Sequence, residues 1–208
     1  MPSPNFFSLL LTGQIESAYF PQHDNLYCKF SFAHGQDWII LHGLEEGITQ
    51  QSLASSSPTV STSAIATGLL VRPCVWNFPI ELAFKSTNIY GWPRIVVSVY
   101  GTDEFGRDVI RGYGTMLLPR SSGRFEKYIE MFAPIATSPL NQLLSWVVGK
   151  LPEFMDSKFV AQSDGREVTR VRSQGAVKVQ LNVTIRDIAK CGYMLGPANA
   201  AEPPRSSK

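Results

Sequence analysis

Three arginines near the C-terminal end are the residues whose type and spacing most readily suggest chemistry. Arg166, Arg170 and Arg172 are separated by even intervals, so a β-strand would place all three on one face. Guanidinium groups in such a row can bind phosphates or carboxylates through paired hydrogen bonds. Lys178 could extend the row from a neighbouring strand. The row indicates a contact surface for a partner or an anionic lipid; the alternative is a solvated outer face balanced by nearby carboxylates.

A tryptophan in a loop is the second candidate contact. Trp92 lies in the sequence Tyr90-Gly91-Trp92-Pro93, which contains the residues typical of a tight turn. An exposed tryptophan can anchor a partner because it offers a large apolar area and one hydrogen-bond donor. The alternative is that the indole folds back over the end of the domain.

Histidines and carboxylates do not combine into a catalytic or metal-binding pattern. The three histidines all lie in the first predicted loops, and no nucleophile-elbow spacing accompanies them. Asp103, Glu104 and Asp108 flank a single turn, whereas calcium sites in β-sandwiches gather carboxylates from several loops. Such residues more often cap turns. We therefore expect no enzyme activity, no catalytic or metal-ligating residues and no cofactor.

Composition and charge favour a globular protein without nucleic-acid affinity. The 208 residues are 44% hydrophobic and 17% charged, with a net charge of only +2. The positive charge is concentrated in the second half of the chain, which suits an oriented partner or membrane surface. Three distant cysteines without a CxxC spacing indicate a reducing compartment. With neither a secretory signal nor an apolar run of membrane-spanning length, we expect a soluble, cytoplasmic protein.

The spacing of apolar residues predicts a chain built mainly of β-strands. Residues 75–119 contain three runs rich in aromatic and β-branched residues, separated by Gly, Pro and Asn. Residues 95–99 are almost wholly apolar, which suits a central strand covered on both faces. Further strands are predicted over 6–20, with a bulge or bend at Gly13, and over 26–32, 123–132, 158–162, 166–172 and 175–185. The fold class is a mainly-β antiparallel sandwich of about eight strands.

Three other segments complete the predicted organisation of one domain over residues 6–192. Ser138-Pro139 and the apolar spacing that follows predict an amphipathic helix over about 139–151 that packs against the sandwich. Residues 45–73, rich in Ser and Thr, are interpreted as a long loop insertion. Residues 193–208 are polar and rich in Pro and Ala, and we expect a flexible tail.

Several long motifs in this chain resemble the B9-domain family. They are LYCKFSF at 26–32, GQDW at 35–38, VWNFPIELAFKSTNIYGWP at 75–93, SVYGTDEFGRDVIRGYG at 98–114 and GREVTRVRSQG at 165–175. The resemblance runs in order over residues 6–192, and the region around 50–72 departs from it by its length. It implies a C2-type β-sandwich without catalytic residues.

The resemblance also implies a cellular role. Proteins of this family are expected in the cytoskeleton at the ciliary basal body and transition zone, where they assemble with B9 domain-containing protein 2 and the Meckel syndrome type 1 protein. The wider tectonic-like complex would support ciliogenesis, the diffusion barrier of the ciliary membrane and Hedgehog signalling.

Two hypotheses follow, a scaffold subunit that docks related B9 domains through a sheet face or edge, and a peripheral membrane module. The second would bind anionic phospholipid through the basic strand face of Arg166, Arg170 and Arg172.

Overall fold

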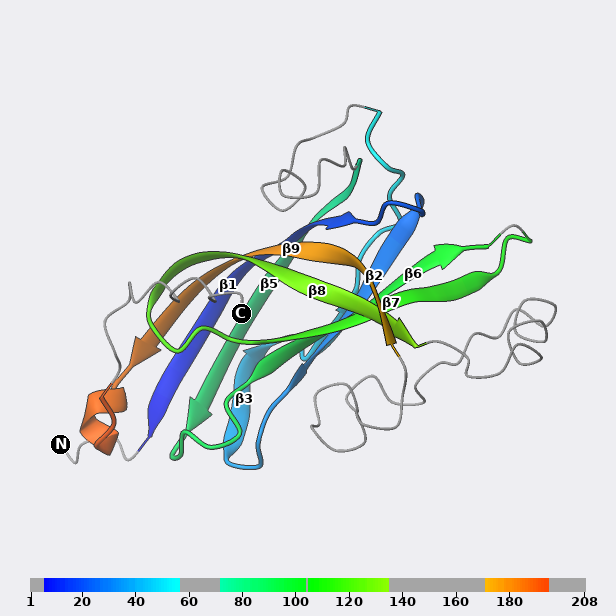
Figure 1. Ribbon diagram of the computed structural model, residues 1–208. Helices are drawn as coiled ribbons and strands as arrows, with labels where there is room; N and C mark the ends of the chain where they lie inside the picture. Colours follow the sequence, from blue (N-terminus) through cyan, green and yellow to red (C-terminus); the bar gives the residue numbers. More distant parts are fainter. Residues whose placement is uncertain (1–5, 57–71, 104, 135–170, 195–208) are drawn as a thin grey trace, which may run out of the picture.

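The computed structural model describes residues 6–56, 72–103, 105–134 and 171–194, and these form a curled antiparallel β-structure (Figure 1). The predicted helix over 139–151, the predicted strand over 158–162, residues 57–71 of the loop and most of the tail lie outside these ranges. The described strands are β1 (Phe7–Tyr19), β2 (Leu26–Ala33), β3 (Trp38–Gly43), β4 (Glu46–Ile48), β5 (Pro73–Ser86), β6 (Arg94–Thr102), β7 (Asp108–Leu117), β8 (Gly123–Pro134) and β9 (Val171–Arg186). The prediction of a mainly-β antiparallel fold is confirmed.

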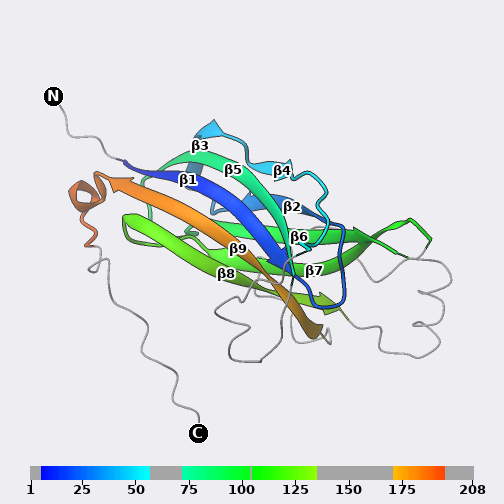
Figure 2. The same cartoon turned by 90° about the horizontal axis from the view of Figure 1, so that it is seen from above.

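The nine strands form one hydrogen-bonded sheet rather than two separate ones. Their order is β3-β5-β1-β9-β8-β7-β6-β2-β4, and all neighbouring pairs are antiparallel. Between β7 and β8 only Tyr113 and Phe132 are paired, so the sheet turns at that corner. Figures 1 and 2 show the result: β5, β1, β9 and β8 lie over β2, β6 and β7. The sandwich is therefore a single sheet folded onto itself.

Alternating side chains from both layers fill the space between them. On β9, Val177, Val179, Leu181 and Val183 all point into the core and are buried. The facing layer contributes alternate residues of β2 and β6, in agreement with the period of two for a strand with one wet face. The exception is β6, where residues 95–99 are buried on both faces, as predicted for a central strand. Its outer face carries a small second cluster around Val96.

The bulge in β1 lies further along the strand than predicted. Gly13 pairs regularly with Ile80 and Leu181, while the register shifts between Ile15 and Ser17 in both ladders. Gly13 instead permits close approach of β9, because a Cβ there would lie 2.0 Å from the Gln180 backbone oxygen. The predicted bulge therefore exists in β1, but it lies between Ile15 and Ser17 rather than at Gly13.

The first part of the predicted 45–73 loop is an ordered part of the sandwich. Residues 46–48 form β4, and backbone bridges then join Ser52 to Leu26 and Ala54 to Cys74. The Thr49 hydroxyl accepts a hydrogen bond from the Cys28 backbone N–H at 2.9 Å. Residues 45–56 are thus joined to the strands by backbone pairing and by Thr49, while the interpretation of residues 45–73 as an insertion stays a prediction.

The described C-terminal part is one long strand followed by a short helix. β9 continues through Gly175, which takes φ 82° where the pairing with β8 changes register, instead of breaking into two strands. The 3-10 helix η3 (Ile188–Cys191) then closes that end. In the described part of the chain, no helix has the length and apolar character needed to cross a membrane.

Candidate interaction surfaces

The predicted basic face is only partly visible in the structure. Arg166 and Arg170 lie outside the described residues. Arg172 is exposed near the start of β9, paired with Ala133 of β8. It remains a candidate contact for anions or a partner.

Lys178 does not extend that face as a free cation. Its ammonium group lies 2.9 Å from a Glu16 carboxylate oxygen and 3.0 Å from one of Glu126. The second Glu16 oxygen accepts a hydrogen bond from Gln180 at 2.6 Å. Although partial burial alone would lower the pKa of Lys178, the hydrogen bonds and charges of the two glutamates raise it above its usual value. The lysine therefore joins β1, β9 and β8 to one another, and its assignment to a contact surface is corrected.

The prediction that Trp92 is an exposed contact residue is also wrong, because Trp92 is buried. Its side chain is 7% exposed, and its indole N–H donates to the Leu118 carbonyl at 3.1 Å. Its ring packs edge-on against Trp38, with 5.0 Å between ring centroids, and stacks on Phe7. The alternative considered from the sequence, in which the indole folds back over the sandwich end, is the observed one. The exposed aromatic of this loop is Tyr90, at 77%.

The polar groups at the opposite end of the sandwich serve the local fold. In the β6–β7 turn, the Asp103 carboxylate accepts hydrogen bonds from the backbone N–H groups of Phe105 and Arg107 and pairs with the Arg107 guanidinium at 2.8 Å. These contacts, first of all the Arg107 backbone N–H, hold the pKa of Asp103 below its usual range. Asp103 caps the turn, and within the described ranges no group of three or more potential ligands could hold a metal ion.

A set of exposed apolar side chains follows the segment from β3 to the residues after β4, and the spacing of the sequence did not predict it. Its side chains come from one continuous stretch of chain and are each between 53% and 69% exposed. We call this surface the apolar edge; it consists of Ile39, Leu41, Leu44, Ile48 and Leu53. The apolar run at residues 38–41 was a usable signal, although the preceding polar loop obscured it.

The apolar edge coincides with both ends of the sheet. Among the described strands, β3 pairs only with β5 and β4 only with β2, so each has a strand on one side alone. Figure 2 shows β3 and β4 following one another along the same side of the molecule. Leu41 is the extra residue of a bulge, because the register to β5 shifts between Ile40 and His42. Exposed edges with apolar side chains are typical of protein contact sites.

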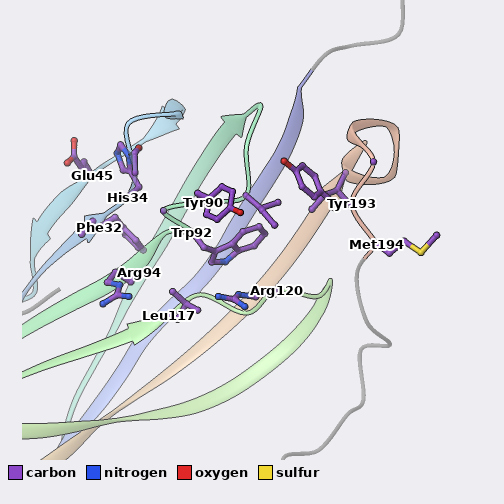
Figure 3. Close-up of a pocket in the computed structure, with 16 residues that line it drawn as sticks. Phe32, His34, Glu45, Tyr90, Trp92, Arg94, Leu117, Arg120, Tyr193 and Met194 are labelled. Atoms are coloured by element: carbon purple, nitrogen blue, oxygen red, sulfur yellow. The ribbon is translucent and has the colours of Figure 1, made fainter. Parts of the chain in front are cut away.

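A groove at one end of the sandwich is the second candidate interaction surface. It has a volume of about 1070 Å³ and lies at the end of the sandwich formed by the β2–β3 and β5–β6 connections, the residues after β7, and η3. Figure 3 shows Trp92 in its centre, with Arg94, Leu117 and Arg120 along one wall and Tyr193 and Met194 toward one end. We call this surface the end groove.

By its fold and surfaces, the described part of the chain belongs to the class of antiparallel β-sandwich proteins. Within the described residues it has an unpaired apolar edge and no assembled catalytic group. Comparison with known proteins then gives the family. The model of the ciliary basal body-associated B9 proteins (B9-C2) matches residues 9–184, so this chain belongs to that family.

Individual relatives agree with this assignment. The chain is 53% identical to B9 domain-containing protein 1 of Mus musculus, over 95% of this chain and 91% of the relative. It is 28% identical to B9 domain-containing protein 2 of Bos taurus, over 86% and 94% of the two chains. Among solved structures, a C2 domain of plant extended synaptotagmin 1 gives a TM-score of 0.38 at 10% identity, covering 85% of this chain and 94% of that one. None of these names describes an enzyme.

Proposed function

We propose that this chain is a non-enzymatic scaffold subunit of the tectonic-like complex at the ciliary transition zone. In that role it supports ciliogenesis, the diffusion barrier of the ciliary membrane and Hedgehog signalling. Its direct partners are B9 domain-containing protein 2 and the Meckel syndrome type 1 protein. Membership of the ciliary B9 family over residues 9–184 carries the cellular part of this proposal.

The apolar edge carries the molecular part, because it supplies a surface that a related sandwich can cover. A partner with its own edge strand can lie beside β3, contacting the side chains of Ile39, Leu41 and Leu44. The bulge at Leu41 interrupts the backbone ladder, which limits indiscriminate strand pairing. Side-chain contacts, rather than a long shared ladder, therefore supply the specificity.

The contribution of each side chain of the apolar edge to the binding free energy can be worked out from its exposed fraction. Full burial of a Leu or Ile side chain is worth about 1.5–3 kcal/mol, and each member of the apolar edge already has about a third to a half of its surface covered. Covering the remainder gains about 1 kcal/mol for each side chain. Two lost side chains therefore weaken binding by about 2 kcal/mol, or about thirtyfold.

The double variant Leu41→Ser with Leu44→Ser tests this surface. The purified chain is titrated with purified B9 domain-containing protein 2 by isothermal calorimetry, and circular dichroism confirms the fold. Phe105→Ser is the matched control, because Phe105 is 66% exposed, similar to Leu41 and Leu44, but lies in the β6–β7 turn outside the apolar edge. We expect the edge variant to bind about thirtyfold more weakly and the control to bind normally. Equal affinities of the unaltered chain, the edge variant and the control would exclude the apolar edge, and failure of the unaltered chain to bind B9 domain-containing protein 2 would exclude direct docking to that partner.

A further inference from the structure

We propose that the outer face of β6 and β7 is the docking site for residues 139–151 of this same chain, packed against it as an amphipathic helix. This inference concerns a different surface from the apolar edge and does not depend on the proposed function. It rests on the burial of that face, on the points at which the chain leaves and re-enters the described sheet, and on the spacing of apolar residues between those points.

An apolar cluster lies on the face of β6 and β7 that points away from the core of the sandwich. Its side chains come from four neighbouring strands, and the strand register places them on one face: Tyr113 of β7 is paired with Ser98 of β6 and with Phe132 of β8. The other layer, with β5, β1 and β9, lies on the opposite side of β6 (Figures 1 and 2). We call this surface the outer apolar face; it consists of Ala33, Val96, Tyr100, Ile110, Tyr113 and Phe132.

The centre of the outer apolar face is covered. Val96, Ser98 and Tyr113 are each only 1% exposed. Neighbours within a sheet stand beside a side chain rather than above it, and the Tyr113 ring extends further from the sheet than the serine with which it is paired. Burial of Tyr113 therefore requires a further layer over this face. The described strands of the other layer lie on the core side and do not provide it.

The chain leaves and re-enters the sheet beside the outer apolar face. Pro134 at the end of β8 is paired with Val171 at the start of β9, so the two ends of the intervening segment, residues 135–170, meet at one place. Phe132 of the outer apolar face comes two positions before Pro134. Five residues of extended chain span about 17 Å, more than the roughly 14 Å across four neighbouring strands, so residue 139 can reach the face. A segment tethered beside a surface has a high effective concentration there, which a separate protein would have to overcome.

The same segment contains an apolar stripe that needs a partner surface. Apolar residues at spacings of three and four fall on one side of a helix. They are Leu140, Leu143, Leu144, Val147, Val148 and Leu151. A helix over 139–151 would be about 20 Å long, which matches the width of the outer apolar face. An isolated helix of this length is marginal in water, and an apolar sheet face is unfavourable when it is open to water. Each of the two surfaces supplies the cover that the other needs.

Hydroxyl-radical footprinting of the purified full chain tests this inference, because it measures the accessibility of Tyr113 directly. Tyr90, which is exposed, is the internal reference. The main variant is Leu144→Ser, which removes one side chain from the middle of the apolar stripe and changes no residue of the sandwich core. The matched control is Gln142→Ser, because Gln142 lies two positions away and therefore on the opposite side of the predicted helix.

We expect Tyr113 of the unaltered chain to be oxidised far more slowly than Tyr90 at every protein concentration and without any partner. Leu144→Ser should speed the oxidation of Tyr113 by about tenfold or more, because the loss of one buried leucine side chain shifts the opening equilibrium by such a factor. Gln142→Ser should leave the rate unchanged. Hydrogen exchange of the unaltered chain adds a measurement that needs no variant: the amides of residues 139–151 should be protected.

Four results would overturn the proposal. The first is a Tyr113 that reacts like Tyr90 in the unaltered chain, and the second is an equal response of Tyr113 to the two variants. The third is complete exchange of the amides of residues 139–151 within seconds. The fourth is protection of Tyr113 that appears only at high protein concentration, or only after addition of B9 domain-containing protein 2; it would assign the outer apolar face to a second copy or to that partner.

Discussion

Replacing Lys178 by methionine distinguishes a structural ion-pair partner from a surface contact for anions. The Lys178 side chain is 15% exposed and that of Glu16 21%, whereas Glu126 is 54% exposed. Breaking a fully buried pair costs about 3–5 kcal/mol, and breaking an exposed one about 0.2–1 kcal/mol. The Lys178–Glu16 pair lies between these limits, so we expect Lys178→Met to lower the free energy of unfolding by about 2 kcal/mol.

The matched variants separate the two glutamates. Glu16→Gln should cost about as much as Lys178→Met, while Glu126→Gln should cost less than about 1 kcal/mol, because its carboxylate is already largely solvated. Urea unfolding at neutral pH measures all three, and a double-mutant cycle isolates the Lys178–Glu16 coupling. In a chain of this size the larger loss corresponds to a melting temperature lower by about 4–8 °C. If Lys178→Met unfolds like the unaltered chain, or if Glu126→Gln costs more than Glu16→Gln, the assignment of Lys178 to this network is refuted.

Three further predictions concern backbone packing, pH and lipid. Gly13→Ala should lower the free energy of unfolding in urea by at least about 1–3 kcal/mol, because the new Cβ meets the Gln180 backbone oxygen. Gly106→Ala is the control: its Cβ would meet nothing within 4 Å, so only the cost of the left-handed backbone remains. Burial, with a smaller effect of the Arg111 charge, lowers the pKa of His23 to about 4. As the pH falls, the unfolded chain therefore takes up a proton on His23 before the folded chain does. The contribution of neutral His23 to the free energy of unfolding is complete above about pH 6.5 and falls as the pH approaches 4. His23→Gln should reduce the change in melting temperature over this pH range in a thermal-unfolding series. Arg172→Glu should abolish salt-sensitive sedimentation with phosphatidylserine vesicles if the membrane hypothesis holds, and unchanged sedimentation would count against it.

The strands that could be predicted are those whose pattern is local. The alternation along 175–185 shows which side chains of β9 enter the core, and the almost unbroken apolar run of 95–99 shows a strand covered on both faces. Neither inference requires knowledge of the pairing partner. The same reasoning failed for β3, because its first residue, Trp38, follows a polar segment that resembles the end of a loop.

The site residues were harder to predict because their environments depend on distant parts of the chain. Lys178 is separated from Glu16 by 162 positions, so no local pattern shows that its charge is neutralised. Trp92 is buried by Phe7 and Trp38, which come from other strands. A basic or aromatic residue in a sequence therefore indicates what a surface can offer only once its tertiary neighbours are known.

The apolar edge and the end groove are supported by the same joint between two connections. The Gly35–Gly91 hydrogen bond and the Trp38 indole bond to Tyr90 both tie the segment before β3 to the segment before β6. A Cβ on Gly91 would lie 2.5 Å from the Gly35 Cα, and its φ of 65° already favours glycine. Ile39, the first residue of the apolar edge, follows Trp38 directly, and Trp92, which lines the end groove, follows Gly91 directly. The joint is held by Gly35 with Gly91 and by Trp38 with Tyr90. The positions of the apolar edge and of the end groove therefore both depend on these two contacts.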